Sequence, residues 1–352
     1  MGRKKFRLDV TSTRSRRILF YLTLILLPLL AGVICLCIGR YTTTAGETLA
    51  ALGRILTQGV EQGDNLAKII RDMRLPRIVL AILVGAGLSV AGLAFQSLFA
   101  NPMASPDTLG VAAGASFGAV LALLFDTSTL TTQFIALLMG FAAVGLTLSI
   151  GKGKGAERSL TSMILGGMVI SSLFSALISL VKLVADTDSK LPAITYWLMG
   201  SLSNATWYTV AFALPFVLGG IGLLYSIRWR LNILPMSEDE IQASGSNVTV
   251  LRLVTALAST MITAACVSTC GQVGWVGLLI PHICRMALGS DNMVLVPASV
   301  SVGALFMILV DTAARSLSPS EIPVSVLTAI IGAPVFIALL RKTGGWSLCP
   351  LK

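Results

Sequence analysis

The chain has 352 residues, of which 55% are hydrophobic and only 12% are charged. Such a composition leaves too little polar surface for a soluble globular protein and indicates an integral membrane protein. The formal net charge of +10 could suit a nucleic-acid binder, but seven basic residues crowd the first 17 positions, where Phe6 is the one aromatic residue among them. That cluster is typical of the cytoplasmic flank of a first membrane span.

Charge-free apolar stretches predict about ten membrane-spanning helices and therefore an all-α membrane protein. The expected spans cover residues 18–39, 78–99, 108–125, 130–151, 159–181, 207–227, 253–270, 273–288, 292–310 and 322–340. The uncharged run over 253–284 would reach about 48 Å as one helix, which is too long for a single crossing. We therefore divide it at the glycines of CGQVGWVG, residues 270–277.

An even number of spans puts both termini on one side of the membrane, and the basic cluster assigns that side to the cytoplasm. This topology assigns the whole net charge of +10 to the cytoplasmic face. We expect a basic cytoplasmic segment over residues 1–17, a single transmembrane domain over 18–345 and a cytoplasmic tail over 346–352. No polar segment is long enough for a soluble core, so an energy-coupling module would be another chain.

Two patterns that resemble ligand sites do not meet the chemical requirements. Six cysteines and a single histidine offer no Cys/His set for zinc, so we expect no metal site. The segment GKGKGAER, residues 151–158, lacks the Ser or Thr that must follow the lysine of a phosphate-binding loop. We therefore expect neither a nucleotide nor a catalytic site in this chain.

The segment RDMRLPR, residues 71–77, places three arginines just before the second span, on the predicted outer face. Pro76 suits the first turn of a helix, so we expect Arg74 and Arg77 to stand at the membrane rim. Two interpretations are open. The arginines could reach toward lipid phosphates, or they could form a cationic platform for an acidic partner.

Several long motifs in one order resemble the FecCD permease family, the membrane subunits of type II ABC importers for iron-siderophore, haem and cobalamin uptake. The resemblance covers residues 71–345. The motifs are RLPR, GAGLSVAGLAFQ, NPMASPDTLGVAAGASFGA, WLMGSL, GWVGLLIPHICR, Asp291, LVDTAAR and IPVSVLTAIIGAPVFIALL.

The resemblance implies a permease of ten helices in the prokaryotic cytoplasmic (inner) membrane, with both termini cytoplasmic. Its partners would be two ATP-binding subunits, which hold ATP and Mg, an extracytoplasmic substrate-binding protein and a second permease, either a copy or a close relative. The family's docking arginines map to Arg74, Arg77 and Arg315. Asp311 lies four residues before Arg315, so we expect it to orient that arginine.

The resemblance also assigns the predicted inner loop over 231–248 as the coupling loop that seats a short helix in the ATPase. The residues that carry this assignment are Ser237, Glu238, Asp239, Glu240, Ala243 and Gly245. Ile241 stands where the family usually has alanine, and Ser244 where it usually has leucine. A solvated acidic loop is the simpler alternative.

The fifth span carries Thr161, Met168, Ser172, Ser175 and Ser179 along one helical stripe. Helix packing with hydroxyls bonded to their own backbone is one interpretation. The resemblance implies the other, a lining of the translocation path. It also assigns the loop before this span, with Gly151, Lys152, Gly153 and Lys154, to a cytoplasmic gate.

The sequence therefore predicts a transport subunit and not an enzyme, with ferric siderophore as the expected substrate and haem or cobalamin as alternatives. The competing class is a self-sufficient secondary transporter or channel. Such proteins place ionisable groups near the bilayer midplane, whereas the predicted spans are uncharged through their central portions.

Overall fold

The structure is a computed structural model that describes residues 14–39, 43–57, 64–150, 160–236, 238–243, 245, 247–318 and 320–342. Every regular element in these ranges is helical. Helices occupy all ten predicted spans: α1 (Arg14–Cys37), α4 (Leu75–Leu98), α5 (Val111–Leu124), α6 (Thr129–Ile150), α7 (Leu160–Val184), α9 (Trp207–Ser226), α11 (Val248–Cys270), α12 (Val276–Leu288), α13 (Asn292–Ser316) and α14 (Val324–Lys342).

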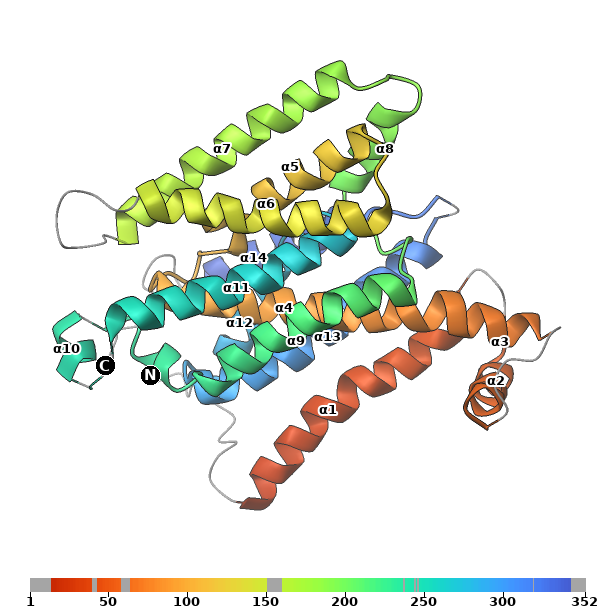
Figure 1. The fold of residues 1–352 in the computed structure, drawn as a ribbon. Coiled ribbons are helices and arrows are strands. Elements are labelled where there is room, and N and C mark those ends of the chain that lie inside the picture. The colour runs from red at the N-terminus through yellow and green to blue at the C-terminus, as the bar shows by residue number, and fades with distance from the viewer. Residues whose placement is uncertain are drawn as a thin grey trace.

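Shorter elements connect these helices. They are α2 (Ala45–Thr57), α3 (Asn65–Ile69), the π-helical turn η1 (Ile70–Arg74), the 3₁₀ turns η2 (Pro106–Leu109) and η3 (Arg230–Asn232), α8 (Lys190–Leu198) and α10 (Glu238–Ala243). In Figure 1, α2 and α3 lie at one end of the bundle and α10 at the other. We call these the α2 end and the α10 end.

Seven described helices are long and apolar enough to cross a membrane, whereas α5, α12 and the apolar part of α14 are shorter. The division of the long uncharged run is confirmed. Gly271 ends α11 with a φ of 74°, and α12 begins only at Val276. Positive φ costs glycine little, because it has no Cβ to clash with the backbone, so the chain can turn back here.

Pro76 lies in the first turn of α4, as predicted, but the helix does not begin there as a separate element. Residues Asn65–Leu98 form one continuous helix of 34 residues, in which η1 leads directly into α4. The Leu75 N–H reaches the carbonyl of Ile70, five residues back, which is the wider turn of a π-helix. Only Leu75 separates Pro76 from this turn, so the helix passes through a residue that donates no backbone hydrogen bond.

The middle of the bundle is α4. In the most apolar part of Asn65–Leu98, 89% of the residues are buried, against 17% in α1 at the periphery (Figure 1). Small residues permit this central position, because a Cβ on Gly85 would lie 2.2 Å from the carbonyl oxygen of Gly303 in α13. A Cβ on Gly92 would lie 1.8 Å from that of Gly277 in α12. At both positions the backbone of α4 therefore packs directly against the backbone of a neighbouring helix.

The predicted start of the third span is partly confirmed. Ser105 is the N-cap of η2, and its backbone N–H donates to the Thr108 hydroxyl at 3.0 Å. Pro106 takes the first helical position. The turn then stops at Gly110, whose φ is 78°, and α5 begins one residue later.

Candidate functional site

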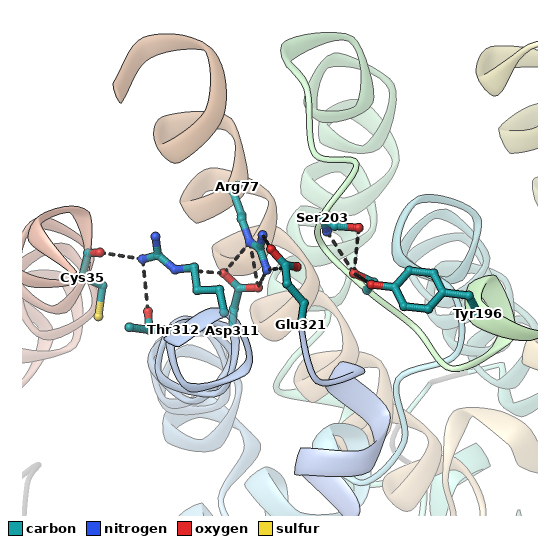
Figure 2. A network of polar contacts seen from close by, with 9 residues as sticks. Cys35, Arg77, Tyr196, Ser203, Asp311, Thr312 and Glu321 are labelled. Atoms are coloured by element: carbon teal, nitrogen blue, oxygen red, sulfur yellow. Dashed lines mark hydrogen bonds and ion pairs between the residues drawn. The ribbon is translucent and has the colours of Figure 1, made fainter. Parts of the chain in front are cut away.

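The three predicted docking arginines converge at the α2 end of the bundle. Arg74 and Arg77 come from the helix over η1 and α4, and Arg315 comes from the last turn of α13. Figure 2 shows Arg77 between Asp311 of α13 and Glu321, which lies in the segment before α14. All three arginines are buried, with 5% to 9% of their surface exposed. Their guanidinium groups therefore contact partners within the protein and do not extend into solvent.

Arg77 is held by two carboxylates at once. Its Nε and Nη2 donate to Asp311 at 2.9–3.0 Å, and its Nη1 and Nη2 donate to Glu321 at 2.9 and 3.0 Å. Each pairing is bidentate, the geometry in which a guanidinium binds a carboxylate most specifically. Arg77 thus joins α4 to α13 and to the segment that precedes α14.

Arg74 and Arg315 both stabilise the C-terminal end of α1. Arg74 Nη1 donates to the Leu36 carbonyl at 2.7 Å, and Arg315 Nη2 donates to the Cys35 carbonyl at 2.6 Å. The last carbonyls of a helix have no partner within the helix and carry partial negative charge, so cations bind well there. Arg74 also donates to the Thr43 hydroxyl at 3.1 Å.

Asp311 has a different principal partner from the one we expected. Its carboxylate lies 4.0 Å from Arg315 Nε but accepts three hydrogen bonds from Arg77, at 2.9–3.0 Å. The spacing within α13 suggested Arg315. The better geometry belongs to an arginine 234 positions away in the chain, which approaches from a neighbouring helix.

A cleft of about 1380 Å³ opens beside this cluster at the α2 end. Arg74, Arg77, Arg315 and Glu321 line one side of it. The beginning of α6, with Gln133 and Phe134, and the beginning of α9, with Tyr208 and Phe212, also line it. Among the charged side chains that line the cleft, the three arginines exceed the two acids, Asp72 and Glu321, by one positive charge, which suits an acidic partner.

The predicted coupling residues lie at the α10 end. Glu238, Asp239, Glu240 and Ala243 form α10 itself, and Gly245 follows with a φ of 75°, while Ser237 falls outside the described residues. Glu240, Ala243 and Gly245 are exposed, whereas Ile241 is fully buried. The isoleucine that departs from the family's usual alanine therefore anchors the short helix to the rest of the chain.

The five predicted path residues all lie on the exposed face of α7: Thr161, Met168, Ser172, Ser175 and Ser179. The opposite face of α7 is buried, and Gly167 packs against the backbone of Thr108 there. Ser172 and Ser179 donate to the carbonyls four residues earlier, at 2.9 and 3.0 Å. Residues 151–159, with the predicted gate residues Gly151, Lys152, Gly153 and Lys154, lie outside the described part of the chain.

A second, smaller cavity of about 260 Å³ lies between α4, η2, α11 and the segment before α12. Asp107, Gln272 and Trp275 are among the residues that line it. The Gln272 amide donates to the Ser116 hydroxyl at 2.8 Å. This cavity brings together residues that we did not predict as a site.

Glu321 is the residue of the main cluster that the sequence analysis missed. It is the only acidic residue after Asp311 in the chain and stands two positions before Pro323, at the predicted outer start of the last span. A lone acid between two apolar spans was an available signal. Its partner could not be inferred, because 244 positions separate Glu321 from Arg77.

Comparison with known proteins places this architecture in a family. The FecCD transport family matches residues 25–342. The molybdate import system permease protein of Haemophilus influenzae is 42% identical over 330 residues, which cover 93% of this chain and 96% of that protein. The Fe(3+) dicitrate transport system permease protein of Escherichia coli is 34% identical over 280 residues, which cover 78% of this chain and 84% of that protein.

A solved structure agrees in the whole fold. It is described as an inward-facing conformation of a "metal-chelate type ABC transporter", and its TM-score with this chain is 0.83 at 39% identity. The match covers 92% of this chain and 99% of the other. The chain therefore belongs to the FecCD transport family and is a multi-pass permease subunit of an ABC importer.

Proposed function

We propose that this chain forms the translocation path of a binding-protein-dependent importer that carries an anionic metal compound into the cytoplasm. Its partners are two ATP-binding subunits, an extracytoplasmic substrate-binding protein and a second permease subunit. ATP and Mg belong to the ATP-binding subunits, and this chain performs no covalent chemistry. The α2 end faces outward, and both termini are cytoplasmic.

The observation that supports this proposal most directly is the separation of two interaction surfaces. A buried arginine cluster beside a large cleft lies at the α2 end, and the short acidic helix α10 lies at the opposite end (Figure 1). Arg228 and Arg230 follow α9, and Arg252 lies near the beginning of α11, all at the α10 end. Basic residues concentrate on the cytoplasmic side of membrane proteins, which supports the proposed orientation.

The proposed cycle uses both surfaces. The loaded binding protein presents carboxylates to Arg74, Arg77 and Arg315, and α10 seats in the ATP-binding subunit. Closure of the ATP-binding subunits then moves α10 and the attached helices, which opens the path past α7. Alternating exposure of the path requires only that the binding protein and ATP favour different arrangements of the same helices.

The substrate class rests on chemistry that two relatives share. One is described as a permease for molybdate and the other for ferric dicitrate. Both substrates are anionic metal compounds, and we propose this class for the substrate of this chain. Of the ferric siderophores expected from the sequence, those with a net negative charge belong to it. The α7 stripe offers hydroxyls and a thioether and no charged group, which suits brief contacts with a passing anion.

The first test is purification of the tagged chain with whatever accompanies it, followed by measurement of ATP hydrolysis. We expect an ATP-binding subunit to copurify. Alanine at Glu238, Asp239 and Glu240 together should lower its association or its stimulated activity. The matched control is Asp188→Ala, which removes an exposed acid from the segment between α7 and α8.

A preparation that holds no ATP-binding subunit yet transports substrate down an ion gradient would contradict the proposal and favour a secondary transporter. The substrate class has a separate test. Reconstituted importer with its binding protein should take up radiolabelled molybdate or radiolabelled ferric citrate in an ATP-dependent manner. Uptake of neither, with uptake of an uncharged or cationic metal complex, would exclude an anionic substrate.

A further inference from the structure

We propose that Glu321 is an internal competitor for the docking site: it occupies Arg77 until a carboxylate of the substrate-binding protein takes its place. The inference rests on the proposed function, since it assumes that an acidic partner docks at the α2 end. It adds a residue outside the predicted docking set and assigns it a role in controlling docking. Figure 2 shows the arrangement from which it follows.

The first step concerns the capacity of one guanidinium. Arginine carries five N–H groups in a planar fork, with two edges that can each hold a carboxylate bidentately. Asp311 takes the edge formed by Nε and Nη2, and Glu321 takes the edge formed by Nη1 and Nη2. Both edges of Arg77 are therefore filled. A carboxylate from a partner can pair bidentately with Arg77 only after one of these two leaves.

The second step decides which carboxylate leaves. The Asp311 side chain is 2% exposed, sits within α13 and does not line the cleft. The Glu321 side chain is 19% exposed, lies outside the regular helices and lines the cleft together with Arg77. A partner that enters the cleft therefore reaches the edge held by Glu321. The longer side chain of glutamate can also swing into water, where its charge is solvated.

The exchange has a small net cost. One charge-assisted pair breaks and an equivalent one forms, while Asp311 keeps Arg77 paired throughout. If Asp311 left instead, a nearly fully buried carboxylate would lose its main partner, and such a group is strongly destabilising. The geometry thus allows replacement of Glu321 and opposes replacement of Asp311.

The third step concerns what Glu321 holds in place. The Ile322 N–H donates to the Ala314 carbonyl at 3.1 Å, and the Val324 N–H donates to the Gly200 carbonyl at 3.0 Å. Glu321 is thus the side-chain anchor of a short segment that joins α13 to the first turn of α14. Its release loosens this connection, so the arrival of the binding protein changes the constraint at the start of α14.

The main test compares Glu321→Gln with wild type in the complete importer, held in nanodiscs with its ATP-binding subunits. The probe is the binding protein that copurifies with the wild-type complex. We expect the variant to bind it more tightly, by roughly tenfold, because the competing charge is gone. The binding-protein concentration that half-saturates ATPase stimulation should fall by the same factor, with the maximal rate unchanged.

Asp72→Asn is the matched control for charge alone. Asp72 lines the same cleft but pairs with Arg71 at 2.7 Å and not with Arg77. Its replacement should change affinity by less than about twofold, because this exposed pair interacts weakly with more distant groups. Equal tightening in Asp72→Asn and Glu321→Gln would overturn the proposal, since charge in the cleft would then explain the effect.

A second measurement uses the unmodified chain and does not depend on folding of the variant. Hydrogen exchange in a peptide over residues 317–323 should increase when the binding protein docks. Unchanged exchange with bound partner, or weaker binding by a folded Glu321→Gln variant, would overturn the competitor role while leaving the importer intact. Failure of the wild-type complex to bind any such partner would instead overturn the proposed function, and this inference with it.

Discussion

Burial of Asp311 is tolerated because Arg77 meets it along a full bidentate edge. Removal of one member of a buried ion pair leaves the other without its partner and typically costs about 3–5 kcal/mol. We expect Asp311→Asn to fall at the low end of this range, about 3 kcal/mol, since Glu321 still holds Arg77. Thermal unfolding of the purified chain in detergent measures the loss.

Asp72→Asn serves as the reference for this measurement. Both side chains of the Arg71–Asp72 pair are nearly half exposed, so water already solvates them. We expect a change below about 1 kcal/mol. Equal losses in the two variants would show that burial of the Arg77–Asp311 pair has no energetic consequence.

Glu47 gives a pH-dependent prediction at the start of α2. Hydrogen bonds from the Thr44 backbone N–H and hydroxyl lower the pKa of Glu47, because they favour its charged form. Because the pKa of Glu47 is lowered, the stabilisation from its hydrogen bonds with Thr44 is fully present above the ordinary pKa of glutamate. It is lost as the pH falls through the lowered pKa of the folded state. Hydrogen exchange in the first turn of α2 should therefore accelerate, after correction for intrinsic rates, as the solution is acidified.

Glu47→Gln is the control for that experiment. Its amide oxygen can still accept from the Thr44 N–H, but it does not titrate, so the acid-dependent increase should disappear. The same increase in both variants would locate the titrating group elsewhere.

At the level of single residues, the sequence identified the arginines that gather at the α2 end but not what they contact. The motif put Arg74, Arg77 and Arg315 in one set, and they do line one cleft. Their bonds to Leu36, Asp311, Glu321 and Cys35 come from segments that are distant in the chain. No local spacing predicts such contacts, because packing of the helices creates them.

Among the helices, the close contact of α4 with α12 gives a direct test of packing. Gly92→Ala would place a methyl group 1.8 Å from the Gly277 carbonyl oxygen, so backbone must move. We expect a loss of about 1–3 kcal/mol or more. Gly145→Ala in α6 is the matched control, because nothing lies within 4 Å of its Cβ position.

The control should have the opposite sign. Alanine is a better helix former than glycine, so Gly145→Ala should stabilise the chain by about 0.5–1 kcal/mol. Thermal unfolding measures both variants. A loss in Gly145→Ala as large as that in Gly92→Ala would contradict the packing argument.

The spans themselves were predictable from hydropathy, and the ends of the helices were not. The continuous helix over Asn65–Leu98 crosses five charged residues and a proline, each of which suggests a boundary. A π-helical turn and burial against neighbouring helices override those local signals. The helices α2 and α8 were missed for a related reason, since they are too short or too polar to read as membrane spans.

For the whole molecule, the proposed path past α7 can be tested by thiol accessibility. In a background without the six native cysteines, Ser175→Cys in the assembled importer should react with a small hydrophilic thiol reagent. Ile25→Cys is the control, because α1 is exposed at the periphery of the bundle and should face lipid. Reaction at Ile25→Cys alone would place the aqueous path elsewhere.

The number and order of the apolar helices could be predicted from the sequence, because each of the ten apolar segments is recognisable without tertiary detail. The arrangement of the helices in space could not. That α4 lies in the middle depends on Gly85 and Gly92 meeting carbonyl groups of α13 and α12. Similar small-residue spacings occur on other spans and do not reveal which helix is the partner.

The hydroxyls on α7 have a consequence for traffic along the proposed path. The hydroxyls of Ser172 and Ser179 already donate to carbonyl groups of their own helix. Each hydroxyl oxygen therefore has only lone pairs left for other partners. An oxyanion or a carboxylate chelate also offers mainly lone pairs, so these two serines cannot donate to it. If the proposed path carries an anion, these two serines would therefore accept hydrogen bonds from its water shell and would not bind the anion itself.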